Sequence, residues 1–594
     1  MHGDVGPPPC MALPHRRCTR WRLCIWCTGR SFGSVPPRKQ DRHMCPSGQF
    51  GTLQPHADCV HHELPHEVAY TVRAWARSPS SHPLLGDWRR AGYRRGSHGP
   101  QAAADRVISA SDFGIRPDHD GDVSDALQEA LNDIGARGGG ALILDKGRYV
   151  LDNPLFVHDH HVILRGAGTD ETTLYFTRPL AQSLGEVIEA ESGQSAWSWT
   201  GGQVFFTSRE RLMMSQTLHW NIATAHEGWL PGPPETDVAP AERGAQTLLV
   251  SKTSAIVPGA MMLLEVDNLL DHRLLREIAG DVAGAKVYDW ETRAARISAP
   301  APLADYSAWR WPLVVTQVLS PHAVRIEQPL RLTIHRQVPA RLRALGPSVH
   351  DSGVEDLTIE NRLLPQTEHN RHPGSNGVCF QAVYDCWAKN VRVVNADCAF
   401  VLTSAKSCTL SGISYRGRAL HHFVACRAQS HDNLVEDFLL DDFTIPPVPG
   451  SVLHGINLEG LSSGNVYRRG VMRTGTFDSH RQMPFENLRT DITITNKDGK
   501  PGGAWDAGPR YGARTVHWGV TVTNDQSLSV DVSDSAPRSL TAGIVGLNHP
   551  GSGHESEFMG DLESRRLAFG SDLAGTRDLL DLQRRTVPPE RTLL

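Results

Sequence analysis

Short apolar runs recur between about Cys379 and Val522, and polar residues flank each of them. The first set of runs begins at Asn390, Cys408, Asn433, Asn465, Leu488 and Arg514. A second set fills the intervals, at Ala399–Leu402, His422–Ala425 and His454–Leu458. Successive starts lie roughly 20 to 30 residues apart, a spacing typical of solenoid repeats. Two or three short strands per period, with little helical periodicity, predict a parallel β-helix in which each coil buries its apolar face against its neighbours.

A different pattern precedes these coils. Ala126–Ile134 places Leu127, Ala130, Leu131 and Ile134 on one face at helical spacing, and three glycines beginning at Gly138 end that helix. The Asp-rich loop over 118–125 lacks the ligand spacing of an EF-hand, so it is expected to cap the helix rather than bind calcium. Predicted strands follow at Ala141–Leu144, Gly147–Leu151, Val162–Gly168 and Thr173–Phe176.

This order of parts resembles the N-terminal region of the pectate-lyase superfamily. The matching pieces are Asp112–Gly114, the Asp-rich loop, the helix, the triple glycine, Lys146–Tyr149 and Leu164–Gly168. The resemblance implies a right-handed parallel β-helix whose open end is capped by the helix. It says little about chemistry, because lyases, hydrolases, epimerases and phage tailspikes share this arrangement.

The predicted fold is therefore all-β: a right-handed parallel β-helix with an N-terminal capping helix and a small inserted β-rich domain. Five segments are expected. Residues 1–105 form a disordered tail or a non-native extension of the reading frame; 106–184 form the cap and first coils; 185–345 form the inserted domain; 346–530 form the main coils; 531–594 form a tail or cap. Leu269–Arg276 is expected to form a short helix inside the insertion.

Charge and composition narrow the class of function. The net charge is −5 and the chain has no basic face that would predict nucleic-acid binding. No apolar run is long enough to span a bilayer, and no signal peptide is recognisable after any early methionine. Five cysteines from Cys379 to Cys426 are expected to be small core residues, whereas Cys24 and Cys27 have C-x-x-C spacing without a second pair. The oligomeric state stays open.

The candidate chemistry lies within the coils, in a segment dense in groups that move protons. The residues predicted to be catalytic are His480, Arg481, Asp478, His454, Arg489 and His517. Those predicted to bind substrate are Trp505, Asp506, Arg514, Glu486, Glu459 and His422. Trp197 and Trp199 offer aromatic faces for a sugar ring, although core packing is the plainer interpretation.

Two reactions compete for this cluster. β-Elimination on a uronic-acid polymer needs a base near the C5 proton, for which His480, His454 or His517 is available, and an arginine to neutralise the carboxylate. Hydrolysis needs two carboxyl groups, one of them protonated. The motifs of polygalacturonases are not found as a set, so the arginine-rich segment favours a polysaccharide lyase over a glycoside hydrolase.

A non-catalytic polysaccharide-binding or tailspike-like β-helix is the third alternative. By resemblance the partner is a polysaccharide and the location is secreted or in the cell envelope. No cofactor or metal is predicted; some relatives of this fold use Ca²⁺, which stays open because no set of spaced carboxylates requires it.

Overall fold

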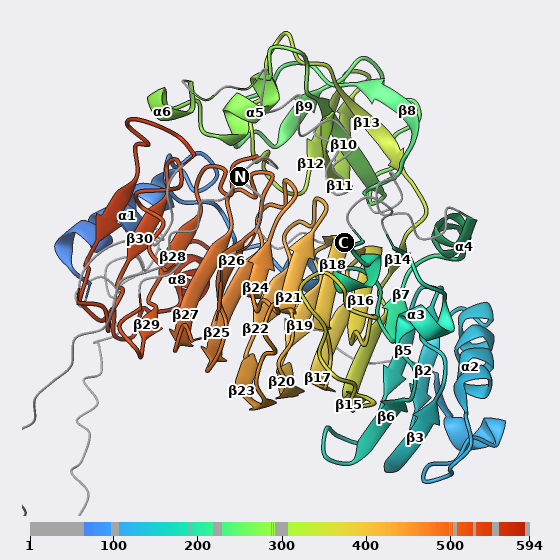
Figure 1. Ribbon diagram of the computed structural model, residues 1–594. Coiled ribbons are helices and arrows are strands. Elements are labelled where there is room, and N and C mark those ends of the chain that lie inside the picture. The colour runs from blue at the N-terminus through green and yellow to red at the C-terminus, as the bar shows by residue number, and fades with distance from the viewer. Residues whose placement is uncertain are drawn as a thin grey trace, which may run out of the picture. The chain divides into compact units, whose positions relative to one another are not determined.

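The computed structural model describes residues 64–96, 106–188, 193–217, 228–286, 288, 290, 307–497, 499–500, 502, 508–526, 530–548 and 557–588. Two parallel sheets dominate these residues, one of 17 strands and one of eight, and strands of successive coils pair in register (Figure 1). The predicted parallel β-helix is confirmed, and so is the resemblance at the level of fold. No helix in the described ranges combines the length and the apolar character needed to cross a bilayer.

The 17-stranded sheet contains β1 (Val107–Ser109), β2 (Gly140–Ile143), β3 (Gly147–Leu151), β5 (Val162–Arg165), β6 (Thr172–Phe176), β15 (Gly353–Asn361), β17 (Trp387–Val394), β19 (Thr409–Ser411), β20 (Ser414–Arg418), β22 (Leu434–Glu436), β23 (Leu439–Ile445), β25 (Val466–Met472), β27 (Leu488–Ile494), β28 (Val516–Trp518), β29 (Thr521–Val522), β30 (Leu540–Ala542) and β31 (Arg565–Leu567). The eight-stranded sheet contains β4 (Leu155–Val157), β7 (Val204–Phe206), β14 (Val349–His350), β16 (Val378–Tyr384), β18 (Cys398–Lys406), β21 (His422–Arg427), β24 (Gly455–Leu458) and β26 (Thr476–Ser479).

The larger sheet turns a corner at one position of each coil. Asp356, Asn390, Asp437 and Arg469 lie there in register and have φ of 55°, 50°, 54° and 50°. Left-handed backbone is costly for most L-residues and least so for Asn, Asp and Gly. The polar residues inside the predicted strands are therefore where each coil bends.

A buried ladder of asparagine side chains joins three coils. Asn433 Nδ2 donates to Asn465 Oδ1 over 2.8 Å, and Asn465 Nδ2 donates to Asn487 Oδ1 over 3.0 Å. Asn465 Oδ1 also accepts from the Asn433 backbone N–H, and Asn465 Nδ2 donates to the Ser430 carbonyl. Each amide thus satisfies buried backbone groups that the turn leaves without a strand partner. The asparagines that begin the predicted strands at 433 and 465 have this role.

Apolar side chains fill the inside of the coils. Stacked positions such as Val424, Ile456 and Phe477 belong to one continuous core, and α2 (Ser124–Ala136) covers its N-terminal end through Leu127, Leu131 and Ile134. The predicted capping of α2 by the Asp-rich loop is not borne out, because the N-cap residue is Val123, whose side chain makes no capping hydrogen bond; Asp122 accepts from the Ser124 backbone N–H, over 2.9 Å. The five cysteines from Cys379 to Cys426 are free and buried, as predicted; Cys24 and Cys27 lie outside the described residues.

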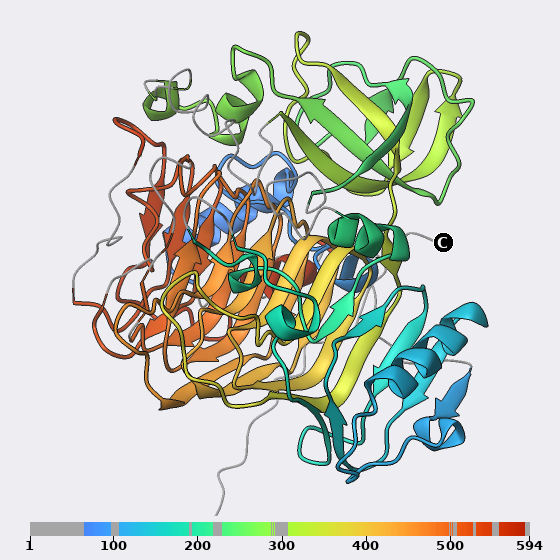
Figure 2. The same ribbon diagram turned by 45° about the vertical axis from the view of Figure 1, so that its right-hand side comes forward.

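The insertion is an antiparallel sheet, drawn as a strongly curved unit in Figure 2. Its strands are β8 (Pro231–Asp237), β9 (Thr247–Leu249), β10 (Met261–Asp267), β11 (Ala308–Ser320), β12 (Ala323–Ile326) and β13 (Ala340–Leu345). The predicted start at 185 is too early, because β7 pairs in parallel with β4 and β16 and so belongs to the coils. The predicted short helix is α5 (Arg273–Ile278).

The coils also extend past their predicted end at 530. β30 pairs with β28, and β31 pairs with β30, so part of 531–594 continues the larger sheet. Within the described residues the other helices are α1 (His66–Arg77), α3 (Leu180–Ser183), α4 (Arg209–Thr217), α6 (Ala283–Lys286) and α8 (Leu579–Thr586), with 3-10 turns η1 (Tyr93–Gly96), η2 (Ala110–Phe113) and η3 (Ala196–Ser198).

The expectation of weak structure up to residue 105 is wrong for 64–96. Helix α1 buries Val68, Val72 and Trp75 in a cluster with outward-facing residues of the larger sheet and with α8. Gln583 of α8 accepts from the Trp88 N–H over 3.1 Å and donates to the Gly86 carbonyl over 2.9 Å. Val68, Val72 and Trp75 have the spacing of one helix face, so the sequence held a local signal for this helix that the prediction missed. The strip of sheet on which the helix packs lies hundreds of residues away, and local sequence does not show that contact.

Candidate active site

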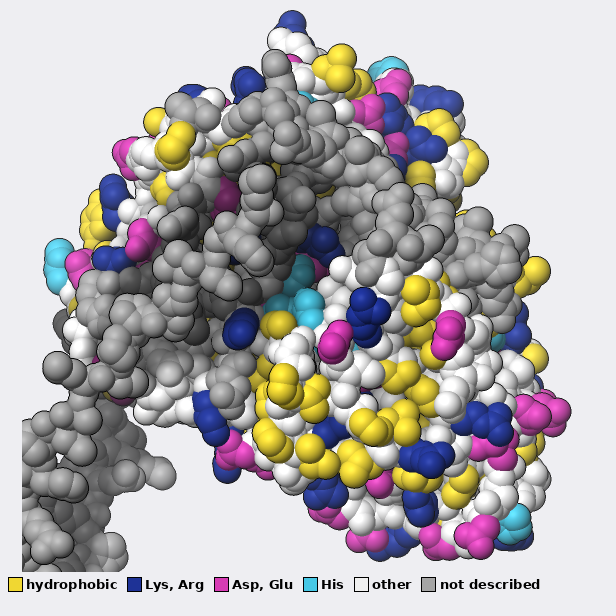
Figure 3. All heavy atoms as spheres, in the orientation of Figure 1, with side chains coloured by type: hydrophobic (Ala, Val, Ile, Leu, Met, Phe, Trp, Pro, Cys, Tyr) yellow, Lys and Arg dark blue, Asp and Glu magenta, His cyan; other side chains and the backbone are white. Residues whose placement is uncertain are grey.

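A cavity of about 390 Å³ lies on the outer face of the eight-stranded sheet. Its floor comes from successive coils and consists of His421, His422, Arg427, His454, Glu459 and His480. Its walls come from loops and include Gln194, Trp199, His369, Asn370, Lys500 and Gly502. Figure 3 shows histidine side chains gathered in a hollow on this face of the molecule.

Strand register brings the floor residues together. Cys426 of β21 pairs with Leu458 of β24, which pairs with Ser479 of β26. The next residue on each coil is Arg427, Glu459 and His480, so three polar side chains stack on neighbouring rungs. A second stack lies at the other end of these strands, where the His454 N–H donates to the His421 carbonyl over 2.9 Å.

Asp478 and His480 form a hydrogen-bonded pair. Asp478 Oδ2 lies 2.9 Å from His480 Nδ1, and Asp478 Oδ1 accepts from the Gly502 N–H over 2.6 Å. Burial raises the pKa of Asp478, but the rings of His480 and His454 outweigh burial and hold that pKa well below its usual range. An ionised carboxylate accepts only, so His480 Nδ1 is the donor and its Nε2 is left as a base.

Arg427 and Glu459 form a buried ion pair beside this dyad. Arg427 Nε lies 2.6 Å from Glu459 Oε1, and Arg427 also donates to the Trp199 carbonyl. Burial raises the pKa of Glu459, yet the charge of Arg427 outweighs burial and lowers the pKa from 4.5 to about 2. Glu459 is therefore a carboxylate at any ordinary pH and has no proton to give.

Four imidazoles around the cavity have pKa values below the usual range. Burial, with neighbouring histidines, moves the pKa of His421 and His422 well below the usual value. Burial also lowers the pKa of His454 to about 4, and burial with His454 does the same for His369. At neutral pH each of these four rings is therefore neutral and offers one nitrogen lone pair to the cavity or to a neighbour.

Two aromatic residues behave differently although they are neighbours in sequence. Trp197 is fully buried and its Nε1 donates to the Gly185 carbonyl over 2.9 Å, as a core residue does. Trp199 lines the cavity, and its Nε1 has no hydrogen-bond partner among the described residues. Trp199 is thus the side chain of the two that is placed for stacking on a sugar ring.

The structure brings half of the predicted site residues together. His480, Arg481, His454, Glu459 and His422 line the cavity, and Asp478 lies beneath His480. Trp505 and Asp506 lie outside the described residues.

Arg489 and His517 lie on the inner side of the coil. Arg489 pairs with Tyr467, a core residue, and with His517 on the next rung, so the pleat directs all three inward. Arg489 Nη1 lies 3.1 Å from His517 Nε2, and Arg489 also donates to the Asp478 carbonyl. These two residues support the rung that carries Asp478 from behind and do not line the cavity.

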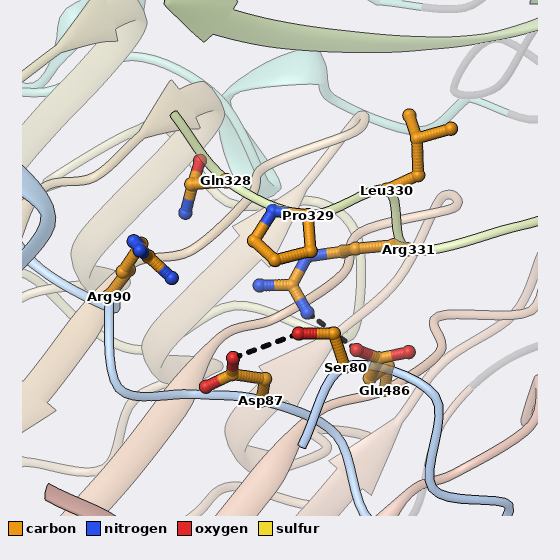
Figure 4. Close-up of a pocket in the computed structure, with 8 residues that line it drawn as sticks. All are labelled: Ser80, Asp87, Arg90, Gln328, Pro329, Leu330, Arg331 and Glu486. Atoms are coloured by element: carbon orange, nitrogen blue, oxygen red, sulfur yellow. Dashed lines mark hydrogen bonds and ion pairs between the residues drawn. The ribbon is translucent and has the colours of Figure 1, made fainter. Parts of the chain in front are cut away.

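Glu486 and Arg514 belong to a separate buried charge network. Glu486 accepts from Arg331 over 2.8 Å, from Arg514 over 3.1 Å and from Arg243 over 3.2 Å. Figure 4 shows Glu486 and Arg331 lining a small cavity with Ser80 and Asp87 of the N-terminal segment. This carboxylate accepts hydrogen bonds from three arginines, two of which belong to the insertion, so its role is to join the inserted domain to the coils.

Four ionisable lining residues are absent from the predicted set: His369, His421, Arg427 and Lys500. His421 precedes β21 and Arg427 ends it, and their alignment with His454 and Glu459 follows from coil length. Aligning successive coils on the adjacent histidines His421 and His422 would have predicted these two residues. His369 lies in a loop that no strand pattern places.

The cavity does not suit calcium. Ca²⁺ takes six to eight oxygen ligands, whereas the described lining donors are chiefly imidazole nitrogens, and the carboxylates of Glu459 and Asp478 are committed to Arg427 and His480.

Comparisons with known proteins add neighbours of distant sequence. No protein-family model matches the chain, and no curated protein matches it. Among solved structures, the tailspike protein gp49 from Pseudomonas phage LKA1 matches 74% of this chain and 71% of its own at 11% identity and a TM-score of 0.41. The gp54 tailspike of Acinetobacter baumannii bacteriophage AP22, solved in complex with a capsular saccharide, matches 75% of this chain and 62% of its own at 10% identity and a TM-score of 0.34. The A-module of the Azotobacter vinelandii mannuronan C-5 epimerase AlgE6 matches 74% of this chain and 80% of its own at 11% identity and a TM-score of 0.27. At these values the neighbours assign no role to any residue here.

Proposed function

We propose that this protein is a polysaccharide lyase that cleaves a uronic-acid-containing polymer by β-elimination. The observation that carries the proposal is the His480 ring, fixed by Asp478 at 2.9 Å, beside Arg481 in a cavity large enough for sugar residues. Trp199 offers a stacking face, and Arg481 and Lys500 offer positive charge for a uronate carboxylate.

The reaction assigns one job to each group. His480 Nε2 takes the C5 proton, C4 and C5 form a double bond, and the C4–O bond breaks. The protonated ring then gives this proton to the departing oxygen, which balances the step. Asp478 stabilises the imidazolium in between, as a buried carboxylate does in a Ser-His-Asp triad. Cationic side chains lower the energy of the negative charge that develops on the uronate.

The carboxylates of the cavity disfavour hydrolysis. A glycoside hydrolase of the usual type needs one protonated carboxyl group, and the pKa values of both Glu459 and Asp478 lie below their usual range. Neutral histidines and positive charge suit elimination better. Since such polymers occur outside cells and in envelopes, we also propose that the protein acts there.

The test is incubation of the full chain with a panel of uronate polymers while absorbance near the unsaturated-uronate band is followed. A rise supports elimination. New reducing ends without that rise indicate hydrolysis, and binding without either indicates a non-catalytic, tailspike-like role. His480→Ala and Arg481→Ala should each abolish the rise with nearly unchanged thermal transitions; activity that survives both changes refutes the site.

A further inference from the structure

Three imidazoles meet at one side of the cavity, next to the Asp478–His480 pair. The rings of His369, His421 and His454 have centroids 4.8, 4.9 and 5.5 Å apart. Each ring offers one nitrogen, and these nitrogens lie within 4.8 Å of one another. The three residues come from a loop and from two successive coils, so the backbone, and not chance crowding on one strand, gathers them.

One ring nitrogen of each of these three histidines lacks a protein partner in the described ranges. His421 Nε2, His454 Nε2 and His369 Nδ1 are buried and have no hydrogen bond within the part of the chain that the structure describes. His421 and His454 are each only 2% exposed. Leaving a buried polar nitrogen without a partner is energetically costly, so three of them in one place favour a bound ligand there.

Hydrogen bonds at Nδ1 fix the tautomers of His421 and His454. His421 Nδ1 lies 2.9 Å from the Ser198 carbonyl, and His454 Nδ1 lies 2.7 Å from the Lys500 carbonyl. A carbonyl oxygen only accepts, so both Nδ1 atoms are donors and both Nε2 atoms present lone pairs. Metal-bound histidines are held in this way, with the second ring nitrogen donating to a carbonyl or carboxylate.

We propose that His369, His421 and His454 bind one divalent transition-metal ion of the Zn²⁺ class. Neutral imidazole nitrogens select such ions over Ca²⁺ and Mg²⁺, which prefer oxygen. In a tetrahedral site with Zn–N of about 2.0–2.1 Å the nitrogens lie roughly 3.3 Å apart, so small ring rotations must draw the three together on binding.

Three protein ligands leave one position open toward the cavity, the pattern of catalytic rather than structural zinc. Resting on the proposed function, the ion would take the uronate carboxylate beside His480 and add its charge to that of Arg481. The binding itself depends only on the three histidines, so it is open to test without any substrate.

The second histidine group sharpens the experiment. His422, His454 and His480 also offer nitrogens within 4.8 Å of one another, and His454 belongs to both groups. His369→Gln and His421→Gln therefore test the proposed ligands, whereas His422→Gln and His480→Gln test the rival set. His369 is partly exposed, so His369→Gln remains informative if His421→Gln fails to fold. His119→Gln, at an exposed histidine, controls for non-specific uptake.

The full chain is stripped with chelator, dialysed against ZnCl₂, and analysed for bound zinc; Co²⁺ is then titrated, because its visible bands report tetrahedral coordination. We expect one equivalent of zinc and a cobalt spectrum of tetrahedral intensity. His369→Gln and His421→Gln should each weaken the Kd at least about tenfold, whereas His422→Gln, His480→Gln and His119→Gln should not.

If the wild type takes up no zinc, only water occupies the space between the three rings and the proposal is overturned. Loss of binding confined to His422→Gln and His480→Gln also overturns the proposal. Zinc bound without elimination on any polymer refutes the proposed function alone; full elimination by a chain that binds no metal refutes the metal site alone.

Discussion

The buried pair of Arg427 and Glu459 supports a prediction whose size follows from the structure. Both side chains are almost fully buried, with 2% and 3% exposure, and their closest atoms lie 2.6 Å apart. Replacing Glu459 by Gln leaves the arginine charge buried without its anion. Breaking one partner of such a pair costs roughly 3–5 kcal/mol. The lowered pKa gives a similar figure, because a shift from 4.5 to about 2 corresponds to roughly 3 kcal/mol.

Urea unfolding at pH 7 measures this cost. We expect Glu459→Gln to lower the free energy of unfolding by about 3–5 kcal/mol, and the double variant Arg427→Met/Glu459→Met to recover most of it, because no charge is then buried. Glu563→Gln removes an acid from a surface pair with Arg538 and should cost no more than about 1 kcal/mol.

The pH dependence has a definite sign. The folded-state pKa of Glu459 is depressed, so its stabilisation is complete above the ordinary value of 4.5 and is lost as pH falls toward 2. Between pH 5 and pH 3 the wild type should lose more stability than the double Met variant. Equal losses, together with a cost below about 1 kcal/mol for Glu459→Gln, would mean that Glu459 is not a buried anion, and hydrolysis with Glu459 as proton donor would return as the better interpretation.

Three further outcomes follow from the same structure. Asn465→Ala removes four buried hydrogen bonds from the ladder and should lower the free energy of unfolding, measured in urea, by roughly 2–5 kcal/mol. Asp478→Asn keeps the shape but not the charge that steadies the His480 imidazolium, so kcat for elimination should fall roughly 10²–10⁴-fold with KM little changed; an unaltered kcat would exclude the dyad. Trp75→Ala should cost roughly 3–5 kcal/mol in thermal or urea unfolding, since Trp75 is fully buried on the packed face of α1, while Tyr70→Ala on the exposed face of the same helix should be nearly neutral. Equal effects of the two changes would mean that α1 is not part of the folded unit.

The coils were predictable because their signal is local and repeated. Apolar runs that begin at Asn433 and Asn465 mark both the strands and the ladder that joins them, and Leu127, Leu131 and Ile134 announce the capping helix. Repetition over many rungs makes such a pattern hard to mistake even when single strands are short.

Only half of the predicted site residues lie at the cavity, because the sequence does not reveal which face of the coil each side chain takes. Arg489 and His480 stand on the same coil, yet the pleat sends one inward and the other into the cavity, and a shift of one residue exchanges the faces. The sequence does not state where each bend falls. The loop residue His369 and the packing of Trp75 depend on contacts across long separations in the chain, so no window of sequence contains them.

The contact between Gln583 and Trp88 has a consequence for the order of assembly. Ribosomal synthesis delivers these two partners at opposite times, because the tryptophan is made almost 500 residues before the glutamine. The apolar face formed by Val68, Val72 and Trp75 therefore remains uncovered by α8 until the nascent polypeptide is nearly complete. A chaperone that binds this face during translation would raise the yield of native protein, whereas deletion of α8 would leave the same face exposed to water.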